Sequence, residues 1–410
     1  MSDDSLQTGS AVTNATGSGP PRGVILGGGF GGIATANTLR QLLPTGIAIT
    51  VIDQSPRFHV GAGKPWVMLG ERTAAGISAP RESVLAPDIE FLESEILRID
   101  LSGRSVLTAA GPRRWDFLVV ALGAVLRPEV VPGMAAAHTF YTVEGAERLQ
   151  PVLAEFSAGK VVLLIPKTPY KCPAAPYESA LLMQEFFAKR GRAGTVQLSV
   201  HTVEGTPMAT AGPEMGIFIR GELARKGIAF FPQKSVVRVD DAARQVEFAD
   251  GTTTPYDLLI CVPPHQAPAL VRAAGLAGPS GWVPVDPQTM EVTAVDGGGR
   301  IFAIGDVASV ALPGRFKPDV NLVLPKAGTI AEAQGAVVAQ RISARVHGRT
   351  PSATFGGRGF CYLEVGDGVA VRGDGAFFAL PHPVMSRQPP SVGQRADKQA
   401  WVAAHLAPRR

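Results

Sequence analysis

Short apolar runs alternate along the chain with segments whose apolar positions recur every three or four residues, and this pattern predicts an α/β fold. Near the amino end, one apolar strand over 24–26 and another over 47–52 enclose a predicted helix. The apolar positions that define this helix are Ile33, Ala36, Leu39, Leu42 and Leu43. Strand, helix and strand in this order predict a βαβ unit of a parallel sheet.

A second unit of the same kind is predicted in the middle of the chain. It begins with the apolar strand "KVVLLIP" (160–166), continues with an apolar helix and reaches another strand at 196–200. The stretch 235–264 predicts a β-meander that returns to a final buried strand. The Gly- and Pro-rich stretch 351–392 predicts a small module of short strands that covers a site. The final segment, "RADKQAWVAAHLAPRR", predicts a short helix with one apolar side, which lies on an anionic membrane surface, docks on the protein or frays as a tail.

Composition excludes several classes of function. The chain has 410 residues, of which 45% are hydrophobic and 18% charged, and its net charge is +4. The positive charge is spread along the chain, so we expect no nucleic acid partner. The three cysteines form neither a disulfide framework nor a metal-binding spacing, so we expect no metal site. The polar start has no signal-peptide core, and no apolar stretch is long enough to span a bilayer, so we expect a cytoplasmic protein.

A glycine-rich turn joins the first predicted strand to its helix. Gly27, Gly29 and Gly32 have the spacing G-x-G-x-x-G, and Asp53 ends the second strand 21 residues after Gly32. Gly27 permits the turn, Gly29 lets a pyrophosphate approach the backbone, and Gly32 lets the helix pack on the strand. Strand, turn, helix, strand and acid together predict dinucleotide binding, with Asp53 accepting hydrogen bonds from the adenosine ribose.

Two further segments favour FAD as this dinucleotide. "WDFLVVALGAVLRP" (115–128) is a buried strand that runs into Gly123, and "GRIFAIGDVASV" (299–310) is a strand that ends at Gly305 and Asp306. The second segment resembles the one in glutathione-reductase-type flavoproteins whose acid holds the ribityl chain of FAD. A carboxylate at the end of a parallel strand is well placed for that contact.

The predicted elements therefore indicate two Rossmann-like FAD/NAD(P)-binding-type domains plus a small C-terminal module. We assign residues 1–22 to a disordered tail, 23–140 and 285–350 to the FAD-binding domain, 141–284 to a second Rossmann-like domain without a Gly-rich NAD loop, and 351–410 to the C-terminal module with its terminal helix.

A cysteine stands where a second cofactor loop would be expected. The strand at 160–166 runs into "TPYKCPAAPYE" (168–178), which has prolines and Cys172 but no glycine. Lys171 and the predicted start of a helix flank Cys172, and both favour a reactive thiolate. Cys361 lies in the C-terminal module and would meet Cys172 if that module folds over the flavin. Cys261, inside the last apolar strand of the meander, is expected to be a buried core residue.

Several segments resemble one family of flavoproteins, the sulfide:quinone oxidoreductases together with the flavoprotein subunit of flavocytochrome c sulfide dehydrogenase. The similar blocks occur in the family's order and are "FHVGAGKPWVMLG" (58–70), "KCPAAPYE" (171–178), "PVDPQTMEV" (284–292), "IFAIGDV" (301–307), "LPKAGTIAEAQG" (324–335) and "GFCYLEV" (359–365). The resemblance covers about residues 23–365. It implies a pyridine nucleotide-disulfide oxidoreductase-like enzyme that oxidises sulfide or a small thiol and passes electrons through FAD to a quinone.

The resemblance also implies roles for individual residues. Cys172 and Cys361 would form a redox disulfide, and Lys326, with backbone NH groups near Gly328 and Thr329, would stabilise the anionic reduced flavin. The FAD would be noncovalent, because 58–66 lacks the tethering cysteine of the cytochrome-linked branch. A homo-oligomer and peripheral membrane contact are further expectations.

The chain departs from the quinone-linked members at one place. Many of them carry a third cysteine before a "T-V-D-H-A"-like run, whereas here the run is "FYTVEGAERL", with Tyr141 at the cysteine position and Gly145 at the histidine position. Three alternatives stay open beside the main hypothesis. They are an NADH:quinone dehydrogenase-like flavoenzyme, a sulfide dehydrogenase-like flavoprotein that reduces a cytochrome, and an FAD-binding electron carrier without sulfide chemistry.

Overall fold

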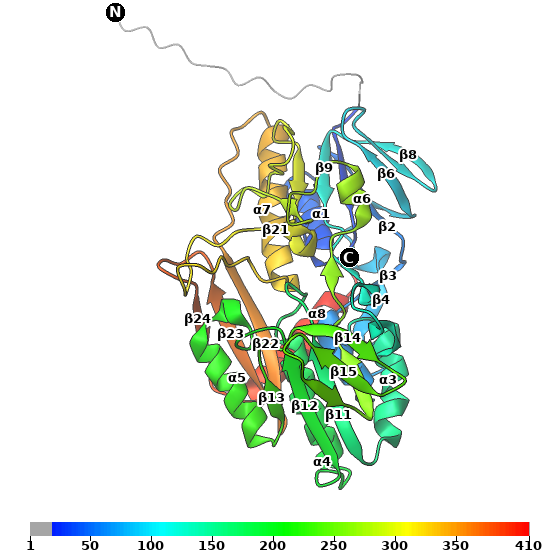
Figure 1. Ribbon diagram of the computed structural model, residues 1–410. Helices are drawn as coiled ribbons and strands as arrows, with labels where there is room; N and C mark the ends of the chain where they lie inside the picture. Colours follow the sequence, from blue (N-terminus) through cyan, green and yellow to red (C-terminus); the bar gives the residue numbers. More distant parts are fainter. Residues whose placement is uncertain (1–18, 410) are drawn as a thin grey trace, which may run out of the picture.

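The structure, a computed structural model, describes residues 19–409, and two parallel sheets form its framework (Figure 1). Most of the tail expected at 1–22 lies outside the described residues. The first sheet has five parallel strands in the order β20-β9-β1-β2-β5. These strands are β1 (Arg22–Leu26), β2 (Ala48–Asp53), β5 (Ile89–Glu93), β9 (Phe117–Val120) and β20 (Ile301–Ala303).

Two helices from distant parts of the chain pack together against this sheet. They are α1 (Phe30–Leu42) and α7 (Gly328–Val346), and they lie side by side in Figure 1. Close contact is possible because a Cβ on Gly335 of α7 would lie 2.6 Å from the carbonyl oxygen of Gly31. β1 and β9 are buried and apolar almost throughout, as strands covered on both faces are.

Small sheets of two or three strands and short helices accompany the two large elements of the fold. One is a three-stranded sheet of β6 (Ile96–Asp100), β7 (Ser105–Thr108) and β8 (Gly111–Arg114). The two-stranded pairs are β3 (Arg57–His59) with β4 (Ser78–Pro80), β10 (Val125–Leu126) with β18 (His265–Gln266), and the parallel pair β19 (Val283–Pro284) with β21 (Ala308–Ser309). The short helices are α2 (Lys64–Met68) and α6 (Ala269–Ala273).

The second parallel sheet has four strands in the order β13-β12-β11-β17. These strands are β11 (Gly159–Ile165), β12 (Val196–Thr202), β13 (Ala229–Phe231) and β17 (Leu258–Cys261). Its helices are α3 (Val143–Glu155), α4 (Ala175–Ala188) and α5 (Pro213–Arg225). The predicted meander is confirmed as β14 (Val236–Asp240), β15 (Gln245–Phe248) and β16 (Thr253–Pro255), and Cys261 is 1% exposed, as expected.

The chain ends in an antiparallel sheet and a helix that lie against both domains. The sheet consists of β22 (Arg358–Gly366), β23 (Val369–Ala376) and β24 (Val384–Arg387), and α8 (Val392–Leu406) follows it. Val402 of α8 is fully buried, and Trp401 stacks on Phe30 at 5.5 Å between ring centroids. The apolar side of α8 therefore faces the protein, and the docking alternative is confirmed.

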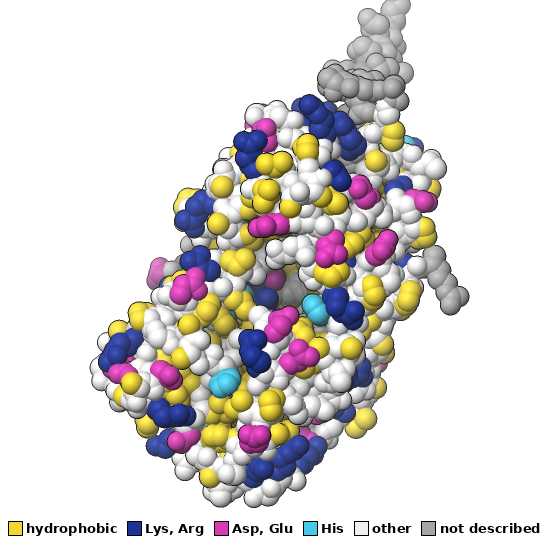
Figure 2. Space-filling model, turned by 90° about the vertical axis from the view of Figure 1, so that its right-hand side faces the viewer, with side chains coloured by type: hydrophobic (Ala, Val, Ile, Leu, Met, Phe, Trp, Pro, Cys, Tyr) yellow, Lys and Arg dark blue, Asp and Glu magenta, His cyan; other side chains and the backbone are white. Residues whose placement is uncertain are grey.

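The expected α/β architecture with two Rossmann-like units is confirmed, with the ends of β1, β2, β11 and β12 displaced by up to two residues from the predicted ones. None of the helices within residues 19–409 is long and apolar enough to cross a bilayer. On the face drawn in Figure 2, acidic and basic side chains are interspersed with hydrophobic ones, and a hollow opens near the middle.

Candidate active site

A cavity of about 460 Å³ lies where the two parallel sheets and the C-terminal sheet meet. The site residues predicted from the sequence that line it are Gly29, Gly123, Cys172, Gly305, Asp306, Lys326, Gly328 and Cys361. Gly27, Gly32 and Asp53 do not line this cavity but build the turn behind it. The fold therefore brings segments up to about 330 residues apart in the sequence to one place.

The glycine-rich turn has the geometry that a pyrophosphate requires. Gly27 has φ +98°, and a Cβ on it would lie 2.3 Å from the carbonyl oxygen of Ala121. A Cβ on Gly32 would lie 1.9 Å from the carbonyl oxygen of Gly27, so α1 could not pack there with a larger residue. A Cβ on Gly29, by contrast, would meet no heavy atom of residues 19–409 within 4 Å. The space in front of Gly29, at the amino end of α1, is thus available to an anionic ligand.

Asp53 supports this turn from behind. One carboxylate oxygen accepts a hydrogen bond from the backbone NH of Gly28 at 2.8 Å, and the other accepts from the NH of Ser55 at 2.9 Å. Arg81, which the sequence did not single out, lies 3.3 Å from the same carboxylate and donates a hydrogen bond to the carbonyl oxygen of Gly28. A Cβ on Gly28 would lie 2.4 Å from the Arg81 side chain, which explains why a glycine also stands between Gly27 and Gly29.

The other wall of the cavity is made of a strand end and a helix start. Gly305 has φ +69°, and its NH donates to the side-chain oxygen of Gln334 at 2.8 Å. This bond holds the turn that presents Asp306 to the cavity. The first residues of α7, Gly328 and Thr329, also line the cavity, so the amino end of a 19-residue helix points toward it. Residues here fit the hydroxylated chain and ring edge of a flavin.

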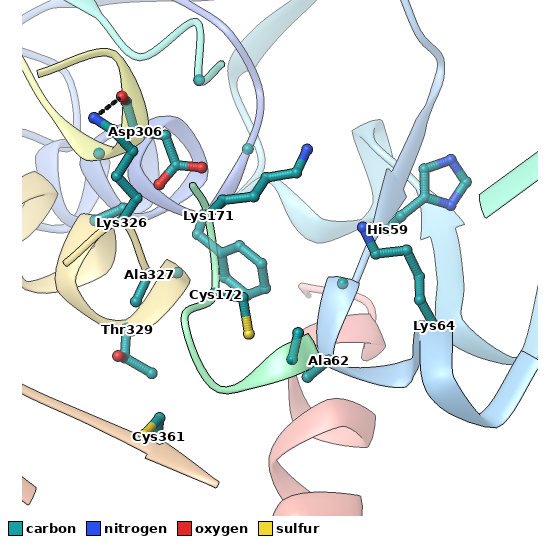
Figure 3. Close-up of a pocket in the computed structure, with 18 of the residues that line it drawn as sticks. His59, Ala62, Lys64, Lys171, Cys172, Asp306, Lys326, Ala327, Thr329 and Cys361 are labelled. Atoms are coloured by element: carbon teal, nitrogen blue, oxygen red, sulfur yellow. Dashed lines mark hydrogen bonds between the residues drawn. The ribbon is translucent and has the colours of Figure 1, made fainter. Parts of the chain in front are cut away.

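Lys326, which we expect to stabilise the reduced flavin, lines the cavity. Its ammonium donates hydrogen bonds to the carbonyl oxygens of Asp306 at 2.6 Å and Ala308 at 3.1 Å, and it lies 3.6 Å from the ring centroid of Trp282. Figure 3 shows this side chain directed toward Asp306. Burial lowers the pKa of Lys326 to about 8. This ammonium therefore has carbonyl and aromatic partners, and the amino end of α7 is a further positive group beside the cavity.

Cys172 and Cys361 line the same cavity from different domains. Cys172 lies in the loop between β11 and α4, and Cys361 lies in β22 opposite Gly373 of β23. Both thiols are free within the described chain. The backbone of Cys172 has φ +54°, an unusual conformation that is fixed by a 2.7 Å hydrogen bond from its NH to the carbonyl oxygen of Lys326. The second domain thereby ties its cysteine loop directly to the flavin half of the cavity.

The expectation of a low thiol pKa at Cys172 is wrong for this structure. Burial raises the pKa of the Cys172 thiol to about 11 and Glu178 raises it further, while Lys398 and Lys64 lower it. Burial likewise raises the pKa of Cys361 to about 12. The neighbouring Lys171 does not compensate, because its side chain leaves the loop in the opposite direction from the sulfur (Figure 3). Desolvation therefore outweighs the local sequence features that favour a thiolate.

Two lysines give the cavity a positive character. Lys64 and Lys171 line it, and neither forms a salt bridge within residues 19–409. Burial lowers the pKa of Lys64 to about 7, with the charge of Lys171 as the next cause. The Lys64 ammonium donates to the carbonyl oxygen of Tyr141 at 2.5 Å. Lys64 lies in 58–70, one of the segments that resemble the family, but no local pattern indicated that it belongs to a site.

A buried cluster of charges borders the cavity on the side of the C-terminal module. The Lys398 ammonium donates to Glu178 at 2.5 Å and to Glu364 at 2.8 Å. Glu364 also accepts from the indole NH of Trp66 at 2.7 Å and from Arg395 at 2.8 Å. Lys398 is the mid-helix lysine of the amphipathic terminal segment, and its spacing gave no indication that it would be buried.

Comparisons with known proteins agree with this geometry. The family model described as pyridine nucleotide-disulphide oxidoreductase matches residues 21–164 and 180–338, and the model for the central part of the sulfide dehydrogenase (flavocytochrome c) flavoprotein chain matches 147–205. The mitochondrial sulfide:quinone oxidoreductase of Mus musculus is 23% identical over 363 residues, which are 84% of this chain and 75% of the mouse protein. The type II NADH:quinone oxidoreductase of Staphylococcus aureus is 25% identical over 373 residues, which are 85% and 89% of the two chains.

A solved structure shows the same arrangement of domains. The crystal structure of the sulfide:quinone oxidoreductase from Aquifex aeolicus superposes with a TM-score of 0.81 and 25% identity, and the match covers 94% of this chain and 90% of that one. Both family models include the strand that leads to Cys172, and the larger one spans the glycine-rich turn and most of α7. The chain therefore belongs to the pyridine nucleotide-disulphide oxidoreductase family, and within it is similar to the sulfide:quinone oxidoreductases.

Proposed function

We propose that the protein oxidises hydrosulfide, or a small thiol, at Cys172 and Cys361 and delivers the electrons through FAD to a quinone. The observation that carries this proposal is the presence of two free thiols, from segments 189 residues apart, in the same cavity as a dinucleotide-binding turn. The similarity to sulfide:quinone oxidoreductases along most of the chain supports the same donor and acceptor.

The residues that would hold FAD form a continuous path. The turn at Gly29 and the amino end of α1 would bind the pyrophosphate, Asp306 the ribityl hydroxyls, and the amino end of α7 the pyrimidine edge of the flavin. Asp53, at the end of β2, would accept hydrogen bonds from the adenosine ribose. When bound, FAD accepts two electrons from a thiolate and releases them to a quinone. We propose noncovalent binding, because the cysteines that line the cavity within residues 19–409 are the two needed for the sulfur chemistry.

The chain's own side chains account for the sulfur step. Lys64 and Lys171 attract an anion such as hydrosulfide into the cavity. In the oxidised protein, hydrosulfide attacks one sulfur of a Cys172–Cys361 disulfide, so that one S–S bond forms and the other breaks. The cysteine that leaves keeps the electron pair as a thiolate, and the attacked cysteine becomes a persulfide. Lys64 can exchange a proton with these groups near neutral pH, because burial lowers its pKa to about 7.

Aromatic side chains of the C-terminal module suit a quinone. Phe360 and Tyr362 of β22 and Trp401 of α8 line the cavity. These flat, apolar surfaces can stack on a quinone ring, and the docking of α8 places Trp401 there. Val402 and Trp401 of α8 pack against the protein, so this side of the helix does not carry the peripheral membrane contact that we propose for the protein.

Stopped-flow absorbance tests the proposal directly. Sulfide should reduce the flavin of the purified holoprotein rapidly, and Cys172→Ser or Cys361→Ser should abolish this reduction while the flavin content stays the same. Cys261→Ser, in a strand away from the cavity, is the matched control and should retain full activity. Fast reduction by a Cys172→Ser variant would contradict the proposal.

An NADH-oxidising enzyme is the second candidate, because the similarity to type II NADH:quinone oxidoreductase also covers most of the chain. The β11–α4 loop argues against it. A nicotinamide dinucleotide would need glycines there, whereas residues 166–178 contain none and Pro176 stands in the first turn of α4. Anaerobic mixing with NADH alone distinguishes the two functions, since we expect no reduction on the timescale of sulfide.

A further inference from the structure

The hydroxyl of Tyr141 is a polar group buried without a partner. Its side chain is 3% exposed, and the oxygen has no hydrogen bond to any residue within 19–409. Buried hydroxyl groups in folded proteins are nearly always hydrogen-bonded, and an exception calls for a ligand or a catalytic role. Because Tyr141 lines the cavity, the missing partner is expected from the cavity side.

The rest of Tyr141 is held firmly in place. Its NH donates to the Thr139 hydroxyl at 3.1 Å, and its carbonyl oxygen accepts from Lys64 at 2.5 Å. Its ring packs edge-on against His265 at 5.3 Å and beside Phe140 at 5.1 Å between centroids. The ring cannot turn outward to bring the hydroxyl into solvent without breaking these contacts.

The other tyrosines nearby show what Tyr141 lacks. The hydroxyls of Tyr170 and Tyr177 donate to the carboxylate of Glu204 at 2.8 and 2.6 Å. Glu204 also accepts from the Thr202 hydroxyl at 3.2 Å. This carboxylate is thus supplied with donors, and Tyr141 is not among them. Its hydroxyl remains available to a different acceptor.

A candidate acceptor on the cavity side is the sulfur of Cys172. Both residues line the cavity, and after burial itself the charge of Cys172 is the next cause that raises the pKa of Tyr141 well above its usual value. A phenol with such a pKa keeps its proton throughout the physiological range and acts only as a donor toward an anion. The charged or titratable groups around this pair are Lys64, Lys171, Cys361, Glu178, Lys398, Glu204, Tyr170, Tyr177 and His265.

We propose that the Tyr141 hydroxyl donates a hydrogen bond to anionic sulfur at Cys172, either the thiolate or the outer sulfur of a persulfide on it. The inference rests on the proposed function for the identity of that sulfur ligand. A phenol can stabilise a sulfur anion but cannot form an S–S bond. Tyr141 would therefore assist sulfur chemistry at Cys172 without taking part in a relay of sulfur atoms, as the thiol at this position in many quinone-linked relatives could.

The pH dependence of Cys172 alkylation tests this contact. In the reduced holoprotein, iodoacetamide labelling of Cys172 is followed between pH 6 and 10 by peptide mass spectrometry, which separates Cys172 from Cys361. Tyr141→Phe removes only the hydroxyl and should slow this reaction about tenfold across the range, because the pKa of the Cys172 thiol lies above it and rises by about one unit when the hydrogen bond is lost. An unchanged profile would overturn the proposal.

Two controls keep the result interpretable. Tyr256→Phe removes a hydroxyl bound to Asp241 in the meander and should leave the Cys172 profile as in the wild type. The thermal midpoint and flavin content of Tyr141→Phe should equal those of the wild type, because no protein group within residues 19–409 loses a partner. A large loss of thermal stability would mean that the hydroxyl has a structural partner and would count against the proposal.

The same samples separate this inference from the proposed function. If sulfide reduces the wild-type flavin, Tyr141→Phe should lower the rate of that reduction. If sulfide does not reduce the wild-type flavin while Tyr141→Phe still slows the alkylation of Cys172, the contact with Cys172 stands and the proposed substrate is wrong. If sulfide reduces both proteins equally and Cys172 is alkylated at the same rate in both, the function stands and the role of Tyr141 is wrong.

Discussion

The replacement of Lys398 by methionine tests how the terminal helix is held over the active site. Lys398 joins α8 to Glu178 of α4 and Glu364 of β22, and the exposed fractions of these three side chains are 1%, 3% and 1%. With Arg395, the four charges sum to zero. Removal of the lysine leaves one uncompensated negative charge in the interior, where charges are poorly solvated.

The magnitude follows from which carboxylate loses its partner. Glu364 retains hydrogen bonds from Trp66 and Arg395, whereas Glu178 retains only the bond from the backbone NH of Glu364 at 2.9 Å. Breaking a buried pair from one side costs about 3–5 kcal/mol. The loss should appear as α8 opening about 10²- to 10⁴-fold more often, since each factor of ten is about 1.4 kcal/mol.

Hydrogen exchange of α8 peptides measures this opening without global unfolding. We expect Lys398→Met to accelerate exchange at pH 8 and less at pH 5. Burial already raises the pKa of Glu178, and loss of the lysine raises it further, so the folded variant keeps a proton that the unfolded chain releases, and its stability falls as the pH rises. The exposed pair formed by Lys189 is the control, and Lys189→Met should change exchange little.

A double variant provides the decisive comparison. Glu178→Gln together with Lys398→Met removes one charge of each sign and should restore much of the protection that Lys398→Met loses. Equal exchange in the single and double variants would refute the assigned coupling. Exchange of α8 in Lys398→Met within about threefold of the wild type would refute the magnitude derived from burial.

Three further predictions concern the cavity. Gly29→Ala should bind FAD poorly while the apoprotein keeps its thermal midpoint. Gly32→Ala should lower the thermal midpoint itself, because a Cβ on Gly32, unlike one on Gly29, would meet a protein atom at 1.9 Å. Equal loss of stability in both variants would contradict the assignment of the pyrophosphate site. Lys64→Met should alter the step near pH 7 in the pH profile of sulfide-driven flavin reduction, to which the ionisation of the sulfide itself also contributes, and Lys160→Met, at an exposed position, should leave that step as in the wild type. Arg81→Met should weaken FAD binding by misplacing Asp53 and Gly28, as equilibrium dialysis would show, and an unchanged affinity would exclude that support.

The sequence predicts the dinucleotide half of the site well because its determinants are local. The spacing of Gly27, Gly29 and Gly32 encodes a turn whose contacts involve residues near them in the chain or at adjacent strand ends. The same holds for Gly305, whose positive φ ends a buried strand. The ends of β1, β2, β11 and β12 were predicted to within two residues for the same reason, since the apolar runs mark directly which residues the sheets bury.

The remaining part of the site depends on contacts that no local pattern encodes. Lys398 is 220 residues from Glu178, and Lys64 is 77 residues from the carbonyl it contacts. A lysine in an amphipathic segment normally predicts a solvated face, and only the assembled fold shows that two carboxylates receive it. Arg81 was missed likewise, because its partners Gly28 and Asp53 belong to other elements.

Cys172 shows most clearly why local features can give the wrong sign. A flanking lysine and a helix start both favour a thiolate, yet Lys171 points away and burial raises the thiol pKa to about 11. The groups that oppose this rise come from elsewhere, with Lys398 on α8 and Lys64 on α2. Since Lys398 both anchors α8 and favours the Cys172 thiolate, its replacement by methionine should raise the pKa of Cys172 even further while α8 is docked. The reactivity of this cysteine is therefore a property of the assembled C-terminal module, and Lys398→Met should slow Cys172 alkylation even in molecules whose terminal helix is docked.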